Sequence, residues 1–118
     1  MLTFDDGPDE KYTPKLLDVL RENGVKATFF VLAEKAQKYP EIIKRIISEG
    51  HEIGLHYLNH SVPLLRSPLR TRKDFKKAHE ILTSMGVEVR LFRPPWGLFN
   101  PLTYYYAKAN NLKVILWT

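Results

Sequence analysis

Two adjacent carboxylates, Asp5 and Asp6, follow a short apolar run near the start of the chain and precede a Gly-Pro pair. Apolar residues that lead into Gly-Pro are typical of a buried strand that ends in a turn. Two like charges at such a position need a positive charge nearby, such as a metal ion or an arginine. The alternative is a solvated Asp-Asp turn without a chemical role.

Two imidazoles, those of His56 and His60, stand four residues apart. In a helical turn this spacing puts both rings on one face, where they can bind one metal ion. Histidines that lie at the surface or in the core are the alternative. Because the chain has no cysteine, a metal site must use His, Asp or Glu. One Asp with two His forms an open zinc shell that leaves room for water.

Strand patterns alternate with helix patterns along the chain. Capping residues, prolines and glycines mark the helices, and short apolar runs mark the strands. The predicted order is a strand before Asp5, a helix over 13–24, a strand over 25–32, a helix over 40–50, a strand over 52–55, a loop over 59–70, a helix over 71–86, a strand over 87–92, a helix over 100–110 and a strand over 113–117. This order predicts an α/β fold, a partial (β/α) barrel with about five parallel strands and outer helices.

In a parallel α/β fold, the residues just beyond the carboxyl ends of the strands meet on one face. Asp5 and Asp6 follow the first predicted strand, and His56 directly follows the third. Arg93 follows the strand over 87–92. The sequence therefore predicts that carboxylates, imidazoles and a guanidinium meet at one rim.

Three ordered motifs resemble those of the polysaccharide deacetylases, the NodB-homology domain of carbohydrate esterase family four. They are TFDDGP at 3–8, the His-x-x-x-His that follows GHEIG at 50–54, and FRPPWG at 92–97 with Asn100-Pro101 after it. The resemblance runs from Leu2 to Thr118, so we interpret residues 1–118 as one such domain. The acidic and aromatic fourth motif and the Leu-x-His motif of the family are absent from this chain. We therefore expect a domain that lacks its C-terminal part.

The resemblance implies a role for each matching polar residue. Asp5 would be the general base, and Arg93 would pair with it and hold it ionised. The metal ligands would be Asp6, His56 and His60. The metal would be one divalent ion, with zinc expected and cobalt, nickel or manganese as alternatives.

The resemblance also implies a substrate and a groove for it. Pro95 and Trp96 would form one wall of the sugar groove, and the Trp96 backbone N–H would help to bind the oxyanion. The expected activity is metal-dependent removal of N-acetyl groups from N-acetylhexosamine polysaccharide, such as chitin oligomers or peptidoglycan. Tyr57 stands where the family usually has Ser or Thr. The alternative is a catalytically weak or inactive domain that binds metal and carbohydrate.

The chain has 118 residues and a formal net charge of +5. This surplus is too small to argue for a nucleic-acid partner, although basic residues gather between Arg66 and Lys77. That cluster is interpreted as a solvated face, and a nucleic-acid-binding module would instead bind in a salt-sensitive way. The sequence contains no transmembrane segment and no signal peptide, while the resemblance suggests the cell envelope or secretion.

Three further features are given structural interpretations. His51 is expected to be structural, and His79 is expected to be solvated on a polar helix face. Of the tyrosines at 104–106, at least one should pack inward. A sheet that ends in an unpaired edge should favour self-association through that edge.

Overall fold

The computed structural model describes residues 2–57, 68–94 and 101–116. Strands and helices alternate through these residues, except that two helices follow the second strand. The elements are β1 (Thr3–Gly7), α1 (Thr13–Glu22), β2 (Thr28–Leu32), α2 (Ala33–Lys38), α3 (Pro40–Ser48), β3 (Glu52–Tyr57), α4 (Pro68–Ser84), β4 (Leu91–Phe92), α5 (Pro101–Ala109) and β5 (Lys113–Val114).

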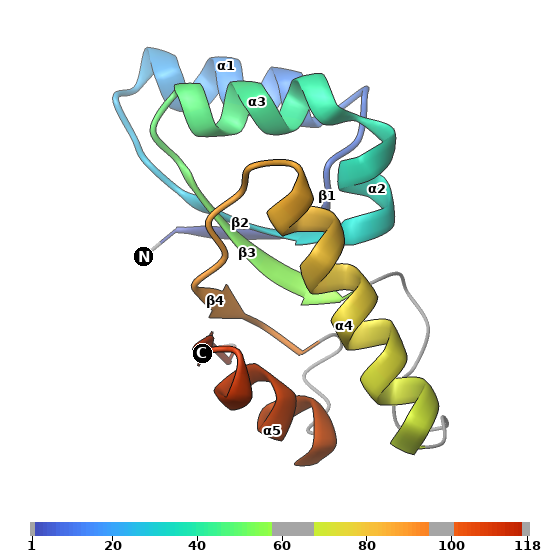
Figure 1. Ribbon diagram of the computed structural model, residues 1–118. Coiled ribbons are helices and arrows are strands. Elements are labelled where there is room, and N and C mark those ends of the chain that lie inside the picture. Colours follow the sequence, from blue (N-terminus) through green and yellow to red (C-terminus); the bar gives the residue numbers. More distant parts are fainter. Residues whose placement is uncertain (1, 58–67, 95–100, 117–118) are drawn as a thin grey trace.

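The five strands are parallel and lie in the order β1-β2-β3-β4-β5, so each strand pairs with the next along the chain (Figure 1). Parallel strands in chain order, connected through helices, are the arrangement of a (β/α) barrel. Within the described residues the sheet stays open, with β1 and β5 as its outer strands. The predicted α/β fold with about five parallel strands is confirmed. Self-association through an outer strand stays a prediction.

The two faces of β2 have different neighbours. Phe29 belongs to the hydrophobic core, together with Leu17 of α1 and Ile46 of α3. Figure 1 shows α1 and α3 running beside each other, and the Arg45 guanidinium of α3 bridges them by an ion pair of 2.5 Å to Asp18 of α1. Successive side chains of a strand point to opposite faces. Phe30, which is fully buried, therefore lies on the other face of the sheet, the face that carries the site described below.

Several element boundaries differ from the sequence prediction. The six-residue helix α2 was not predicted, although its sequence AEKAQK consists of strong helix formers. Helix α4 begins at Pro68, three residues before the start of the helix predicted over 71–86. Where the structure describes the strands predicted over 87–92 and 113–117, they form ladders only at Leu91–Phe92 and Lys113–Val114. Among the described helices, none combines the length and the apolar character needed to cross a membrane.

Candidate active site

The carboxyl ends of three strands bring the predicted polar residues together. Asp5 and Asp6 lie on β1, His56 lies on β3, and Arg93 comes directly after β4. Arg93 Nη1 lies 2.9 Å from Asp5 Oδ1, and His56 Nε2 lies 3.1 Å from Asp6 Oδ1. The predicted meeting of these four side chains at one rim is therefore confirmed. His60, Pro95 and Trp96 lie outside the described residues.

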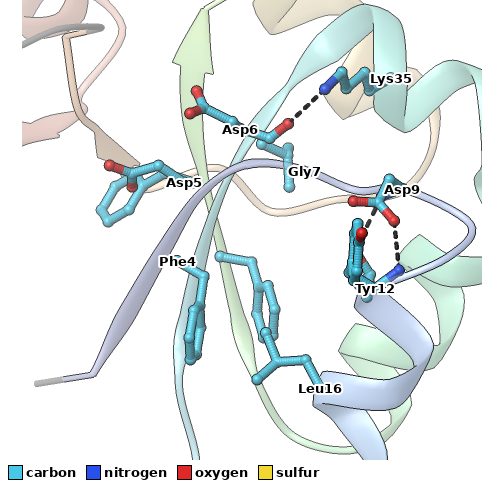
Figure 2. A pocket seen from close by; sticks show the side chains of 12 residues that line it. Phe4, Asp5, Asp6, Gly7, Asp9, Tyr12, Leu16 and Lys35 are labelled. Carbon is cyan, nitrogen blue, oxygen red and sulfur yellow. Dashed lines mark hydrogen bonds between the residues drawn. The ribbon is translucent and has the colours of Figure 1, made fainter.

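A β-bulge at Asp6 explains how two neighbouring carboxylates serve one site. In the pairing with β2, Asp5 lies opposite Phe30 and Gly7 lies opposite Val31, so Asp6 has no opposite residue. Asp6 has φ 71°, a left-handed conformation that costs a non-glycine residue about 1–3 kcal/mol. A bulge of this kind re-aims side chains. In Figure 2 both carboxylates extend from the same side of β1, whereas Phe4 points the other way, toward Leu16.

The segment after the bulge is held by hydrogen bonds from α2 and within the turn that precedes α1. Lys35 of α2 donates from Nζ to the backbone oxygen of Asp6 at 3.1 Å (Figure 2). Asp9 Oδ1 accepts hydrogen bonds from the backbone N–H groups of Lys11 and Tyr12, and the bond from Tyr12 is the main reason that the pKa of Asp9 is lowered. Asp9 thus organises the entry to α1. The bulge and this turn border a pocket of about 520 Å³ that both Asp5 and Asp6 line.

The Arg93 guanidinium is fixed from several directions. Only 6% of its side chain is exposed, against 20% for Asp5. Arg93 Nη1 donates to Asp5 Oδ1 and to the Thr3 hydroxyl, each at 2.9 Å. The guanidinium carbon also lies 4.4 Å from the centre of the Phe30 ring, in a cation–π contact. Such a desolvated, charge-assisted pair has one well-defined geometry.

Gly54 of β3 makes room for the ring beneath this arginine. A Cβ atom at Gly54 would lie 2.6 Å from the Phe30 ring, a distance that real Cβ contacts do not show. Thr3, Phe30 and Gly54 were not identified as site residues from the sequence. The available signal was a glycine inside a strand, which often marks a close approach of another group.

His56 is buried, with 3% of its surface exposed, and its ring has a defined orientation. Its Nδ1 lies 2.8 Å from the backbone oxygen of Arg93. A carbonyl oxygen can only accept, so Nδ1 must carry a hydrogen. In the neutral ring Nε2 is then an acceptor, and it faces a carboxylate oxygen of Asp6. Two acceptors at 3.1 Å require a proton or a cation between them.

The spacing of these two acceptors fits a shared metal ion. Metal bonds of about 2.0–2.1 Å at a tetrahedral angle would separate an oxygen and a nitrogen ligand by roughly 3.3 Å. An Nδ1–H bonded to a backbone carbonyl is also the usual support for a histidine that binds metal through Nε2. Within the described part of the chain, no third His, Asp or Glu joins Asp6 and His56 in a metal-binding group.

The helical-turn interpretation of His56 and His60 is wrong for His56. The ladder between β2 and β3 continues to Tyr57, which pairs with Leu32, so His56 lies inside a strand rather than in a helical turn. Of the other histidines, His51 is structural as predicted, because it is buried and its Nδ1 accepts from the Ala27 N–H. His79 is half-buried and burial lowers its pKa, so it is less solvated than predicted.

A family model of polysaccharide deacetylases matches residues 1–115. This chain belongs to the polysaccharide deacetylase family. A peptidoglycan-N-acetylglucosamine deacetylase of Bacillus cereus is 42% identical over 118 residues, which are 99% of this chain and 43% of that protein. The chain therefore spans less than half the length of this curated relative.

Solved structures of the family share the fold of this chain. A peptidoglycan N-acetylglucosamine deacetylase in complex with 4-naphthalen-1-yl-N-oxidanyl-benzamide is 41% identical, with a TM-score of 0.91 over 98% of this chain and 55% of the other. A pseudoenzyme of the same esterase family, from Bacillus anthracis, is 27% identical, with a TM-score of 0.89 over 99% of this chain and 42% of the other. The family fold thus occurs with and without enzymatic activity.

Proposed function

We propose that this chain carries the metal-binding and base-bearing part of a hydrolase that removes N-acetyl groups from an N-acetylhexosamine polysaccharide. The observation that carries the proposal is the juxtaposition of two pairs at one rim, Asp5 with Arg93 and Asp6 with His56. Relatives named as peptidoglycan deacetylases support a substrate of the peptidoglycan type. Chitin oligomers are the other member of this substrate class.

Each residue of the two pairs has a defined task in this proposal. Asp6 and His56, with His60, would hold one divalent ion, most simply zinc. Such an ion, when bound, polarises the amide carbonyl and makes a water nucleophilic near neutral pH. Asp5 would accept the proton of the attacking water. Arg93 keeps the Asp5 carboxylate in a single orientation for this transfer.

The sugar would bind beside the carboxylates. Pro95 and Trp96 are proposed as one wall of the groove, and the Trp96 backbone N–H as a donor to the oxyanion. The lining of the pocket beside Asp5 and Asp6 also includes apolar side chains, among them Phe4 and Leu16.

The second candidate is a domain that binds metal and carbohydrate without catalysis. The likeness to a pseudoenzyme of the same fold favours it. The two candidates agree on zinc binding and differ on turnover. The same set of protein variants can therefore distinguish the two candidate functions.

The test measures zinc affinity by calorimetry and acetate release from chitin oligomers and peptidoglycan. The proteins are the unaltered chain, Asp5→Asn and His56→Ala. If the chain is a deacetylase, the unaltered chain should release acetate. The Asp5→Asn variant should release none and should keep its zinc affinity. Zinc binding without acetate from either polymer would establish the second candidate. Failure of the unaltered chain to bind zinc would contradict both.

A further inference from the structure

A concave surface between α4 and α5, here called the α4–α5 hollow, shares no lining residue with the pocket at Asp5 and Asp6. Its volume is about 560 Å³. Its polar and aromatic lining includes Arg72, Lys76 and His79 from α4 and Tyr105 and Tyr106 from α5. Part of the basic cluster and part of the tyrosine run thus meet here, and the proposed deacetylation uses neither.

The two cations of the hollow are available to a ligand. Arg72 and Lys76 are exposed, and neither forms an ion pair with any residue in the described ranges. By contrast, Arg45 pairs with Asp18 and with Glu49. An arginine and a lysine one helical turn apart, on the rim of a hollow, favour an anionic group that both can reach.

The aromatic side of the hollow offers a flat and partly polar surface. Tyr105 is 66% exposed, and its ring meets that of Tyr106 edge to face at 5.7 Å. Tyr106 in turn lies 6.1 Å from the ring of Phe75, which is buried beneath it. Tyrosines anchored in this way provide an apolar ring and a hydroxyl at little cost in conformational entropy.

His79 adds hydrogen-bonding capacity without adding charge. Burial lowers its pKa, so the ring is neutral near pH 7 and offers one donor and one acceptor. Glu80 also lines the hollow and opposes the cations in part. The ligand class is therefore one that carries a single anionic group together with a ring rich in hydroxyls.

We propose that the α4–α5 hollow is a binding site for an acidic saccharide. The carboxylate or phosphate of the sugar pairs with Arg72 and Lys76, and the sugar ring packs against Tyr105. This inference concerns binding alone, so its test does not depend on whether the chain is a deacetylase.

The test is a titration of the ¹⁵N-labelled chain followed by NMR, with four probes. N-acetylmuramic acid presents a carboxylate, N-acetylglucosamine 1-phosphate a phosphate, N-acetylglucosamine no charge, and inorganic phosphate no sugar. We expect the acidic sugars to shift resonances of α4 and α5 and to bind at least about 10-fold more tightly than the neutral sugar, a difference of about 1.4 kcal/mol. The tighter of the two acidic sugars identifies the anionic group. Equal affinity for inorganic phosphate and the sugar phosphate would overturn the assignment to a saccharide.

Two double variants that each remove two positive charges distinguish binding at the α4–α5 hollow from non-specific electrostatic attraction to the protein. Arg72→Ala with Lys76→Ala removes the cations of the hollow, whereas Lys73→Ala with Lys77→Ala removes two exposed cations of the same helix that do not line it. We expect about a 10-fold loss of affinity in the first and less than about a twofold loss in the second, since exposed charges that make no contact contribute little. Equal losses would show that net charge alone attracts the sugar and would overturn the proposal. Circular dichroism checks that both variants fold.

Discussion

A buried histidine stands at each end of β3, and the two rings use Nδ1 in opposite ways. His51, just before the strand, accepts a hydrogen bond at Nδ1 from the Ala27 N–H at 3.0 Å. His56, near the carboxyl end, donates from Nδ1 to the backbone oxygen of Arg93 at 2.8 Å. The neutral rings are therefore opposite tautomers. Both rings are buried, and the backbone partner decides which nitrogen remains for chemistry.

This difference in tautomer corresponds to a difference in role. At the amino end, His51 links β3 to the residue before β2 and packs edge to face on Phe29 at 5.5 Å. At the carboxyl end, His56 directs Nε2 toward the Asp6 carboxylate at the open rim. One end of the strand stabilises the sheet, and the other carries the proposed ligand atom.

The largest expected effect comes from exchanging the two histidines for alanine. His56→Ala should weaken zinc binding by more than about 100-fold, because it removes a proposed ligand atom. His51→Ala should leave zinc affinity unchanged and lower the free energy of unfolding by about 1–3 kcal/mol, because the buried Ala27 N–H loses its acceptor. Calorimetry with zinc and urea denaturation measure the two quantities.

The difference in role between His51 and His56 requires that both alanine variants behave as expected. Loss of zinc affinity in His51→Ala would show that the amino end also controls the metal site. A His56→Ala variant that binds zinc normally would remove His56 from the ligand set, and the proposed site with it.

Gly54 gives the next largest effect and tests the support beneath Arg93. In Gly54→Ala the new methyl group would meet the Phe30 ring at 2.6 Å and Leu91 Cβ at 3.2 Å. Overpacking of this kind costs about 1–3 kcal/mol of unfolding free energy. Gly7→Ala is the matched control, because the nearest atom to its Cβ would lie 3.7 Å away. Equal destabilisation of the two variants in thermal unfolding would contradict the steric argument.

The sequence predicted which residues meet at the rim, but it did not predict the local backbone conformation and contacts that bring them together. Motif order and strand alternation were sufficient to expect Asp5 near Arg93, because parallel strands deliver their carboxyl ends to one side. The bulge at Asp6 depends on its pairing with β2, a long-range interaction that no local pattern encodes. A second pairing, that of β3 with β2, extends β3 past His56, which is why the helical-turn interpretation failed. Phe30 went unnoticed as a site residue because its contact with Arg93 exists only in three dimensions.

A smaller effect is expected from the hydroxyl that shares Arg93 Nη1 with Asp5. Thr3→Val keeps the side-chain shape and removes the hydrogen bond of 2.9 Å. Unfolding free energy should fall by about 1 kcal/mol, the usual net contribution of one such bond. If Thr3 positions the arginine, kcat for acetate release should fall while KM stays constant, and Thr3→Ser should restore it. A variant with unchanged kcat would restrict Thr3 to a structural role.

The smallest effect is a pH dependence of stability that arises at the amino end of β3. Burial and the nearby Lys26 ammonium lower the pKa of His51 below 6.5, and Glu49 opposes this shift in part. In the unfolded chain the pKa of a histidine is about 6.5, so a falling pH protonates the unfolded state before the folded state. The contribution of His51 to stability is therefore present above that pH and is lost as the pH falls toward the folded pKa. His79 acts in the same direction, because burial lowers its pKa as well.

Urea denaturation at pH 7.5 and 5.5 should show a smaller loss of stability in His51→Gln, and in His79→Gln, than in the unaltered chain. An undiminished loss in both variants would place the acid sensitivity elsewhere and would leave the tautomer of His51 without a thermodynamic consequence.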